Sequence, residues 1–453
     1  METRLPPGPP LPLWVQTPLL WLGMQPYLDA CHRRYGRTFT VRAAPVGDAV
    51  YITDPADVKA VFAGDPAVYH AGESNAILDD LIGPSSVLML DEVQHRRRRA
   101  LMTPPFHGNA VRRQSEVMAE VTVAEVDGWP IGRPFPLRPR MQALTLEVIL
   151  RTVIGVHDGD RLAALRRALP PLADIGPMLM MRLMYPKLRQ RWPWSRYDRR
   201  QAVADTLLYA EIEHARRDPR LEERPDVLAM LVRARDEDGT PMPDGELRDQ
   251  LVTLLLAGHE TTATALAWTF ERLVRHPEIL QRATEAAESG DDEYLDAVAK
   301  ESMRLRPVLF NVARRLTAPV ELDGYRLPAG IYVILALGLI QRSERHYPEP
   351  GEFRPERFLD GRVDPSTWFP FGGGVRRCLG ATFAGVEMRI VLREVLRRME
   401  LAVTEAPAER VRMRHITLVP GRGATVTVAR RKVPGSASGS PRGDTSGAAP
   451  TAR

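Results

Sequence analysis

The chain has 453 residues, of which 44% are hydrophobic and 26% are charged, a composition typical of globular proteins. It contains only two cysteines, which excludes a disulfide scaffold and an iron–sulfur cluster held by four cysteines and favours a reducing, cytoplasmic setting. The formal net charge is +5, but the segment 430–453 supplies +4 of it through five basic residues and Asp444. The rest of the chain is nearly neutral, so its overall charge gives no support to general nucleic-acid binding.

The N-terminal segment 1–13 is a proline-rich lead to a group of short elements. Because prolines stand where the apolar core of a secretory signal belongs, we expect no export signal. The elements predicted next are a short helix at 25–35 that Gly36 stops, strands at 37–43 and 48–54, a helix at 55–62 with Asp54 as its N-cap, and a loop-rich segment at 64–92.

Four consecutive arginines, 96–99, follow directly after His95. On a helix they point in different directions, so only some of them can share a task. His95 and Arg99 stand at i and i+4 and meet on one face. From the pattern alone, a solvated basic helix face and a nucleic-acid patch are alternatives. From 110 to 240 the chain is predicted to be mainly helical.

The segment from Asp244 to Pro277 has the strongest helical pattern, with its first residue as a possible cap and the proline as a stop. Between 251 and 270 only His259 and Glu260 can carry charge, so a membrane-spanning helix has to be considered. A carboxylate and a cluster of threonines at mid-helix are costly in lipid, whereas a helix buried in protein can turn them toward a cofactor. We therefore expect a buried helix and no membrane span.

The pair His259–Glu260 also invites comparison with the zinc-protease motif H-E-x-x-H, which places two histidines on one helix face. Ala263 occupies the position of the second histidine, which excludes this class of enzyme. The polar residues in the middle of the long helix therefore need another explanation.

A second pair of charges lies on the next predicted helix. Glu301 and Arg304 stand at i and i+3 before Pro307, so they can pair on one side of the helix. Alone, this E-x-x-R pattern is common on solvated helix surfaces. The chain continues at 311–330 with a pattern typical of strand, turn and strand.

The segment Phe369–Gly380 contains three consecutive glycines and Cys378, directly before a predicted helix that starts at 381. Glycines allow backbone conformations that are closed to other residues and let a bulky group approach closely. Free N–H groups and the positive dipole end of the helix favour a thiolate, the form of cysteine that ligates metals. A small buried hydrophobic residue is the alternative for Cys378, and Cys31 is the spare cysteine.

The arrangement Phe371, Gly374, Arg376, Cys378 and Gly380 closely resembles the haem-binding loop of the cytochrome P450 family, in which the cysteine thiolate is the proximal iron ligand. The segment 257–262 resembles that family's oxygen-activation motif, and the order of the motifs along the chain also matches. The resemblance implies a mainly α fold with small β-sheets, in which haem b lies between the long oxygen-activation helix and the cysteine loop. It also implies a single haem domain over residues 1–430, followed by a disordered tail at 431–453.

The resemblance further implies roles for individual residues. Thr261 would orient dioxygen and Glu260 would relay protons, with Thr262 as the alternative if the register differs by one. Gly258 would leave room for dioxygen. A structural triad of Glu301, Arg304 and Arg357 and two substrate-facing residues, Phe310 and Asn311, are also implied. The resemblance implies that His95 and Arg99 bind one haem propionate and that Arg314 binds the other, with Arg315 as its alternative. Cys378 is the implied metal ligand. The other implied haem-binding residues are Ala257, Gly258, Phe371, Gly372, Arg376 and Gly380.

The function that the resemblance implies is a haem-thiolate monooxygenase that inserts one oxygen atom from dioxygen into an apolar or amphipathic small molecule. Electrons come from outside the chain, because it has no convincing GxGxxG-type flavin or nicotinamide domain, and a ferredoxin or flavodoxin with its reductase is the expected partner. A peroxide-driven enzyme of the same fold and a non-enzymatic haem sensor or carrier are the alternatives. The positive charges expected near the docking site are Arg96 to Arg98, Arg377, Arg389, Arg393 and Arg397.

Overall fold

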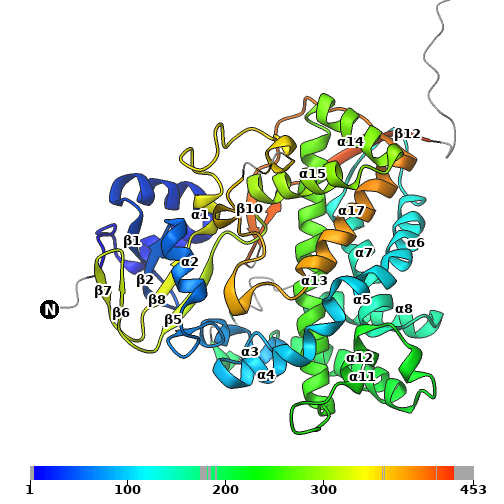
Figure 1. The fold of residues 1–453 in the computed structure, drawn as a ribbon, viewed down its shortest axis with the longest axis horizontal. Coiled ribbons are helices and arrows are strands. Elements are labelled where there is room, and N and C mark those ends of the chain that lie inside the picture. The colour runs from blue at the N-terminus through cyan, green and yellow to red at the C-terminus, as the bar shows by residue number, and fades with distance from the viewer. Residues whose placement is uncertain are drawn as a thin grey trace, which may run out of the picture.

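A long central helix, with the largest sheet to one side of it, defines the architecture of the computed structural model (Figure 1). This mainly helical arrangement confirms the predicted fold class. The central helix α13 (Asp244–Leu273) runs through the molecule, and α7 (Arg138–Ile149) and α17 (Ala381–Arg398) pack against it. The structure describes residues 5–173, 181, 185–188, 191–359, 361, 363–414 and 416–432.

The leucines and alanines of α13 favour a helix, and the helix is buried on almost every side from Leu247 to Leu273. Asp244 is its first residue rather than its cap. The other main helices are α1 (Leu13–Tyr35), α2 (Pro55–Ala63), α3 (Asp79–Ile82), α4 (Glu92–Met102), α5 (Gly108–Arg113), α6 (Ser115–Val126), α8 (Gly159–Ala168), α9 (Pro170–Ala173), α11 (Ser195–Arg217), α12 (Val227–Arg233), α14 (Pro277–Ser289), α15 (Asp292–Leu305) and α16 (Leu337–Ile340).

α1 begins well before the predicted start at residue 25. It consists of two helical pieces that meet at Gly23, where the backbone leaves the helical region with φ −153° and ψ 48°. This break places Pro26 in the first turn of the second piece, where a missing N–H leaves no helical hydrogen bond unmade. The N-cap of α2 is the predicted one, because the Asp54 carboxylate accepts a hydrogen bond from the backbone of Ala56.

The strands form four small sheets, of which the largest has five strands in the order β1-β2-β8-β5-β3. Its first two strands confirm the strands predicted at 37–43 and 48–54 and pair antiparallel with each other, and β2 pairs in parallel with β8. The strands are β1 (Thr38–Ala43), β2 (Gly47–Ile52), β3 (Tyr69–His70), β4 (Pro134–Pro136), β5 (Val312–Leu316), β6 (Val320–Leu322), β7 (Tyr325–Leu327), β8 (Tyr332–Leu335), β9 (Met399–Leu401), β10 (Val411–Arg414), β11 (Thr417–Pro420) and β12 (Thr425–Arg431).

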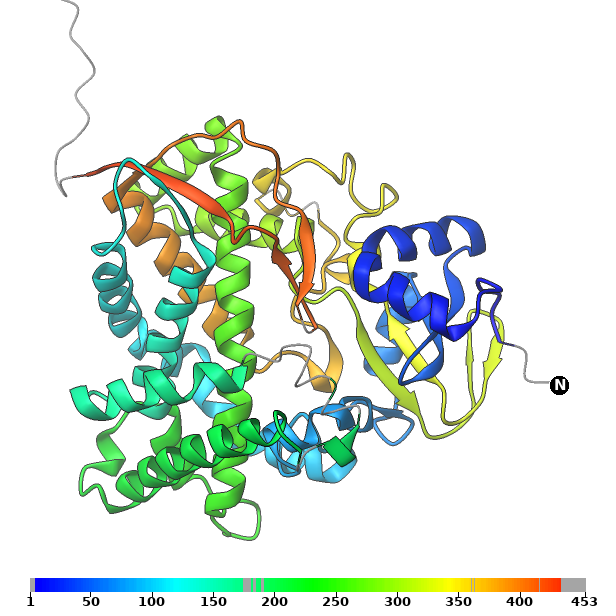
Figure 2. The same ribbon diagram turned by 180° about the vertical axis from the view of Figure 1, so that it is seen from behind.

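The main apolar core surrounds α13, and two smaller apolar clusters lie on the faces of the five-stranded sheet. Viewed from behind, the β10–β11 hairpin lies between α13 and the N-terminal part of the fold (Figure 2). β11 contacts α13 and β10 contacts α1. The hairpin therefore ties the helical and the sheet-rich parts together.

The two ends of the described chain both pack on the fold. Backbone carbonyls of Pro6 and Pro7 in the proline-rich lead accept hydrogen bonds from Thr40 on β1. At the other end, β12 includes Arg431, and Lys432 donates to the carboxylate of Glu288. The rest of the segment that was predicted to be disordered, 433–453, lies outside the described residues. Within the described part of the chain, no helix is both long and apolar enough to cross a membrane.

Candidate active site

The loop that carries Cys378 is shaped by glycine conformations and by a close approach to α2. Gly372 and Gly374 have φ of +64° and +61°, a region that strongly favours glycine. A β-carbon on Gly374 would collide with the backbone carbonyl of Phe62, at the end of α2. The backbone N–H of Cys378 donates to the carbonyl of Phe371 at 2.8 Å, which fixes the cysteine three residues before α17 begins.

The cysteine side chain is accessible within this loop, whereas Cys31 is buried in the apolar cluster beneath α1. Although this side chain reaches solvent, the surrounding protein atoms raise the pKa of the Cys378 thiol by desolvation, and the N–H of Gly380 together with Arg99 and Arg377 opposes this effect only in part. Coordination of a metal ion favours the deprotonated form of a cysteine.

Positive charge gathers around His95 on α4. Burial first, and then the neighbouring Arg376 and Arg99, lower the pKa of His95 to about 4; Arg314 adds to this and Asp91 opposes it. Three guanidinium groups thus face a neutral imidazole and one carboxylate. This excess of positive charge fits an anionic group such as the haem propionates.

The structure distinguishes between the two candidate arginines on β5. Arg314 is buried, its guanidinium carbon lies 5.7 Å from the centre of the Phe62 ring, and burial followed by Arg376 lowers its pKa to about 10. Arg315 instead points away and pairs with Glu73 at 3.0 Å. Arg314 therefore belongs to the charged group around His95. Arg99 also supports the cysteine loop, because its Nη2 donates to the carbonyl of Arg377 at 2.6 Å.

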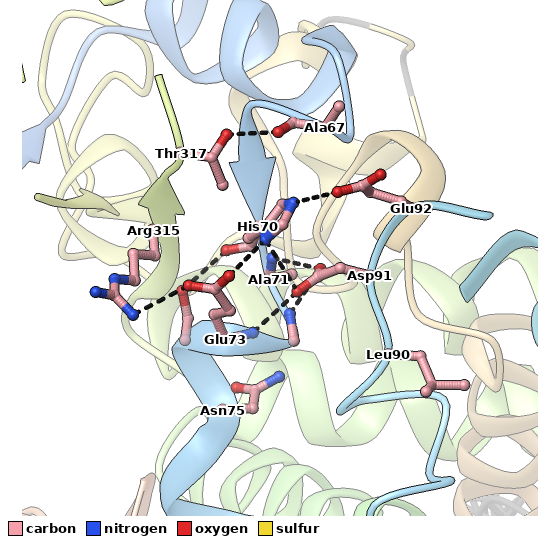
Figure 3. Close-up of polar contacts among 12 residues, drawn as sticks. Ala67, His70, Ala71, Glu73, Asn75, Leu90, Asp91, Glu92, Arg315 and Thr317 are labelled. Atoms are coloured by element: carbon pink, nitrogen blue, oxygen red, sulfur yellow. Dashed lines mark hydrogen bonds and ion pairs between the residues drawn. The ribbon is translucent and has the colours of Figure 1, made fainter. Parts of the chain in front are cut away.

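Asp91, which sequence reasoning did not identify, connects this charged group to the segment between β3 and α4. Its carboxylate accepts hydrogen bonds from the backbone N–H groups of Ala71, Gly72 and Glu73 at 2.9–3.0 Å and pairs with Arg376 at 2.5 Å. Figure 3 shows the carboxylate beneath this turn of backbone. The one feature of the sequence that could have pointed to Asp91 is its position directly before α4.

His70 completes the same cluster (Figure 3). Its Nδ1 lies 2.9 Å from Glu73 and its Nε2 lies 3.0 Å from Glu92. Burial lowers the pKa of His70, but the carboxylates of Glu73, Asp91 and Glu92 outweigh burial and raise it above its usual value. We call His70, Glu73, Asp91 and Glu92 the His70 clasp.

The middle of α13 presents one accessible face on an otherwise buried helix. Of its five accessible residues between 251 and 273, four lie at i, i+3, i+4 and i+7, namely Leu254, Ala257, Gly258 and Thr261. The hydroxyl of Thr261 donates a hydrogen bond to the carbonyl of Ala257, one turn earlier. Bonds of this kind often bend a helix. Thr262 is buried, so of these two threonines Thr261 is the one with an accessible hydroxyl.

Gly258 has a packing role that the sequence did not reveal. A β-carbon at this position would lie 3.2 Å from Cδ1 of Ile149 on α7. The missing side chain therefore lets α13 approach α7 closely.

Glu260 is held by α7, a contact that the sequence did not reveal. Its carboxylate pairs with Arg138 and accepts a hydrogen bond from Nε2 of Gln142 at 2.6 Å. His259 is buried beside it and bonds the carbonyl of Gln142 through Nε2 at 3.1 Å. No local motif links α7 to Glu260, because the partners lie more than a hundred positions earlier in the chain.

The predicted charge triad is confirmed. Arg304 pairs with Glu301 through Nε at 2.7 Å, and both side chains are fully buried. Arg357 donates to the same carboxylate at 3.3 Å. Arg304 also donates to the carbonyls of Gln341 and Pro350 at 2.8 and 3.0 Å. The triad thus fixes the chain that leads to the cysteine loop and has a structural role.

Other predicted positions have different surroundings. Phe310 is 1% exposed and packs against Gly338, and Asn311 contacts Met24 of α1, so the prediction that both face substrate is wrong for Phe310. Several of the arginines that were expected near the docking site pair with carboxylates of the same chain. These are Arg98 with Glu246, Arg389 with Asp292 and Asp296, and Arg393 with Asp292.

The fold, the accessible cysteine at a helix start and the surplus of arginine around it define a thiolate-ligated haem protein. A sequence model of the cytochrome P450 family matches residues 6–424, and the chain belongs to this family. Two Mycobacterium tuberculosis (strain ATCC 25618 / H37Rv) proteins are similar to it. Cytochrome P450 135B1 is 54% identical over 430 residues, covering 94% of this chain and 91% of the relative. Cytochrome P450 135A1 is 44% identical over 426 residues, covering 94% and 95%.

Among solved structures, retinoic acid-bound cyanobacterial CYP120A1 has the same fold. The TM-score is 0.82 at 22% sequence identity, covering 95% of this chain and 100% of that one. The family establishes that the protein is a monooxygenase with a cysteine-ligated haem b, which uses dioxygen and an external source of electrons. Since Cys31 is packed in the core, Cys378 is the iron ligand.

Proposed function

We propose that this monooxygenase inserts one oxygen atom into an apolar or amphipathic small molecule bound against the accessible face of α13. That face is formed by Leu254, Ala257, Gly258 and Thr261 and carries no charge, which favours substrates of low polarity. The observation that carries the proposal is the position of the Thr261 hydroxyl on this face, directly beside Glu260 in the chain.

When bound, haem supplies the iron at which dioxygen is reduced and its O–O bond is broken. We propose that the backbone around Phe371, Gly372 and Gly380 shapes the loop that presents Cys378. Ala257 and Gly258 border the cofactor from α13. His95 and Arg99 on α4, Arg314 on β5 and Arg376 in the loop would hold the propionates, whose negative charges would offset the excess of positive charge there.

Protons for the reaction pass through Glu260 and Thr261 in this proposal. Arg138 and Gln142 hold the Glu260 carboxylate on the α7 side, and the next residue opens onto the accessible face. Rotation of the Glu260 side chain, with water between the two groups, carries a proton from one side of α13 to the other. The Thr261 hydroxyl, released from the carbonyl of Ala257, would then pass the proton to the dioxygen substrate on this face.

The experiment measures the reduced carbon-monoxide spectrum of the purified holoprotein and then the product formed per dioxygen consumed. Thiolate ligation predicts a strongly red-shifted carbonyl band that Cys378→Ala abolishes. Thr261→Ala and Glu260→Gln should lower product yield about tenfold or more, whereas Thr262→Ala, at a buried neighbouring hydroxyl, should not. Unchanged yield in the first two variants contradicts the relay, and turnover with peroxide but not with electron donors indicates the peroxide-driven alternative.

We propose a ferredoxin or flavodoxin with its reductase as the electron donor. Arg96, Arg97 and Arg377 are exposed on α4 and the cysteine loop, and Arg99 joins these two elements. An acidic partner docked there lies close to Cys378. Arg377→Glu should raise the KM for the partner about five- to tenfold, whereas Arg397→Glu, exposed about 25 Å further along α17, should have no effect. Equal effects of both variants would place the docking site elsewhere.

We further propose that residues 1–430 form one haem domain. The family match over residues 6–424 supports this extent, as does the pairing of β12 with both β4 and β9. A reducing, cytoplasmic setting is consistent with two free cysteines and with dependence on a soluble reductase. Limited proteolysis of the holoprotein tests the domain boundary, which would be wrong if cleavage before residue 424 left the haem spectrum intact.

A further inference from the structure

Arginines gather at the C-terminal end of α13, about three helical turns beyond Thr261. Arg272 and Arg275 belong to its last turn and the loop that follows, Arg306 comes directly after α15, and Arg342 comes shortly after α16. We call Arg272, Arg306 and Arg342 the arginine cluster. None of these residues belongs to the charged group around His95.

The contacts place these side chains together. The guanidinium carbon of Arg306 lies 5.4 Å from the ring centre of Trp268, and Trp268 stands one helical turn before Arg272 on the same side of α13. The carbonyl of Gln341 accepts a hydrogen bond from Arg304 at 2.8 Å, which brings the following residue, Arg342, to the end of α15. The cluster thus joins α13, α15 and the chain after α16.

In the described part of the chain, Glu271 is the one carboxylate that pairs with Arg272 and Arg275. It accepts from Nε of Arg272 at 2.6 Å and from Nε of Arg275 at 2.5 Å. The guanidinium of Arg275 also donates hydrogen bonds to the backbone carbonyls of Ala406 and Pro407. Across the described residues, neither Arg306 nor Arg342 has an ion pair or a side-chain hydrogen bond, and the nearby Glu352 is exposed.

Two buried donors of the cluster, Nε of Arg306 and Nη1 of Arg342, have no acceptor among the described residues, and neither does the hydroxyl of Ser302, one turn before Arg306. Nη2 of Arg272 instead pairs with the carboxylate of Glu271. Arg272 itself is only 7% exposed. Burial, followed by the charge of Arg272, lowers the pKa of Arg306 to about 10, so the side chain is still charged at neutral pH. Buried guanidinium groups without acceptors are costly, and an anion removes that cost.

We propose that the arginine cluster is a binding site for a small oxyanion, with inorganic phosphate as the probe. Guanidinium groups match the oxygens of phosphate, and the free donors of Arg306 and Arg342, with the charge of Arg272 beside them, can hold one ion. The bound ion would fasten the end of α13 to α15, which carries Glu301 and Arg304 of the charge triad. The site is separate from the haem and does not depend on the identity of the substrate.

The test is thermal unfolding of the holoprotein in phosphate and in chloride at equal ionic strength, together with the line width of the phosphorus resonance of inorganic phosphate. Binding predicts a Tm about 2 °C or more higher in phosphate and a broadened resonance. Arg306→Met should abolish both effects. Arg345→Met is the matched control, because it removes an equal charge from an exposed residue of the same region, and it should keep both effects.

If Arg306→Met does not fold, phosphate binding by two other variants, measured from the phosphorus resonance, still tests the proposal. Arg342→Met lies on a different segment and should also abolish broadening, and Arg306→Lys should weaken phosphate binding about tenfold because it keeps the charge and loses the fork. The proposal is overturned if wild-type protein does not broaden the resonance, or if Arg306→Met and Arg345→Met retain the same response to phosphate. The haem spectrum of each variant separates this outcome from a failure of the proposed enzymatic function.

Discussion

The cysteine loop and the middle of α13 form the two sides of the site, and different forces hold them in place. The loop depends on backbone geometry, because Gly374 has a φ of +61° and lies against the carbonyl of Phe62. The middle of α13 depends on side chains, because Glu260 is held by Arg138 and Gln142. A steric constraint tolerates almost no substitution, whereas polar contacts can be weakened in steps. The cysteine loop of this enzyme is therefore expected to be rigid, whereas the position of Glu260 in the middle of α13 can be changed by substitution of its partners.

The largest effect is expected at the triad beneath the cysteine loop. Glu301→Gln leaves Arg304 buried without its charged partner, so the free energy of unfolding should fall by about 3–5 kcal/mol. Urea unfolding of the holoprotein measures this loss. Glu349→Gln, which removes an exposed partner of Arg354, should cost less than about 1 kcal/mol. Similar losses in the two variants would show that burial of the triad has no special weight.

Gly374→Ala tests the steric constraint itself. The added carbon meets the carbonyl of Phe62 and the residue must keep a positive φ, so stability should fall by about 2–4 kcal/mol and haem should be lost more readily. Gly385→Ala, within α17 where nothing lies within 4 Å of a new β-carbon, should be neutral or stabilising. Haem retention in size-exclusion chromatography, with thermal unfolding, compares them. A haem-replete Gly374→Ala protein of normal stability would contradict a rigid loop.

A smaller effect is expected on the α13 side. Arg138→Gln removes the charged partner of Glu260, and a buried charge-assisted hydrogen bond of this kind contributes about 2 kcal/mol. Product yield should fall along with stability, because the carboxylate loses its fixed position. Arg140→Gln lies on the same helix and breaks a 3.4 Å pair with Glu125 in which the arginine is 41% exposed, so it should cost less than about 1 kcal/mol. Equal product yields in the two variants would remove Glu260 from the relay.

The smallest effect concerns the His70 clasp. Since the folded protein raises the pKa of His70 above 6.5, the clasp contributes stability that is fully present below that pH and is lost as the pH rises through the raised value. Amide exchange in 71–90, corrected for intrinsic rates, should accelerate about two- to threefold between pH 6 and the alkaline side of that transition. His70→Gln should abolish this dependence. An identical pH dependence in the variant would assign it to other groups.

Most of the architecture was predictable because its determinants are local. The apolar length of α13, the cap at Asp54 and the i, i+3 pair Glu301–Arg304 follow from spacing along the chain, and the structure confirms each. The start of α1 was missed because proline and glycine interrupt its pattern. That interruption proved to be a joint between two helical pieces.

The site was less predictable where its contacts join distant segments. The pairing of Glu260 with Arg138 and Gln142 depends on how α7 packs on α13, which no spacing encodes. The packing of Gly258 on Ile149 was missed for the same reason. The pairing of Arg389 and Arg393 with acidic residues of α15 was missed as well, because these partners lie on another helix.

The contact between Gly374 and the carbonyl of Phe62 also has a consequence for the order of assembly. Phe62 is synthesised early and the cysteine loop near the end of the chain, so the loop can take its final shape only after α2 has docked. Closing so long a stretch of chain is a late and slow event in folding. Capture of haem by Cys378 should therefore report completion of the whole fold, and a truncated or misassembled chain would not acquire the cofactor.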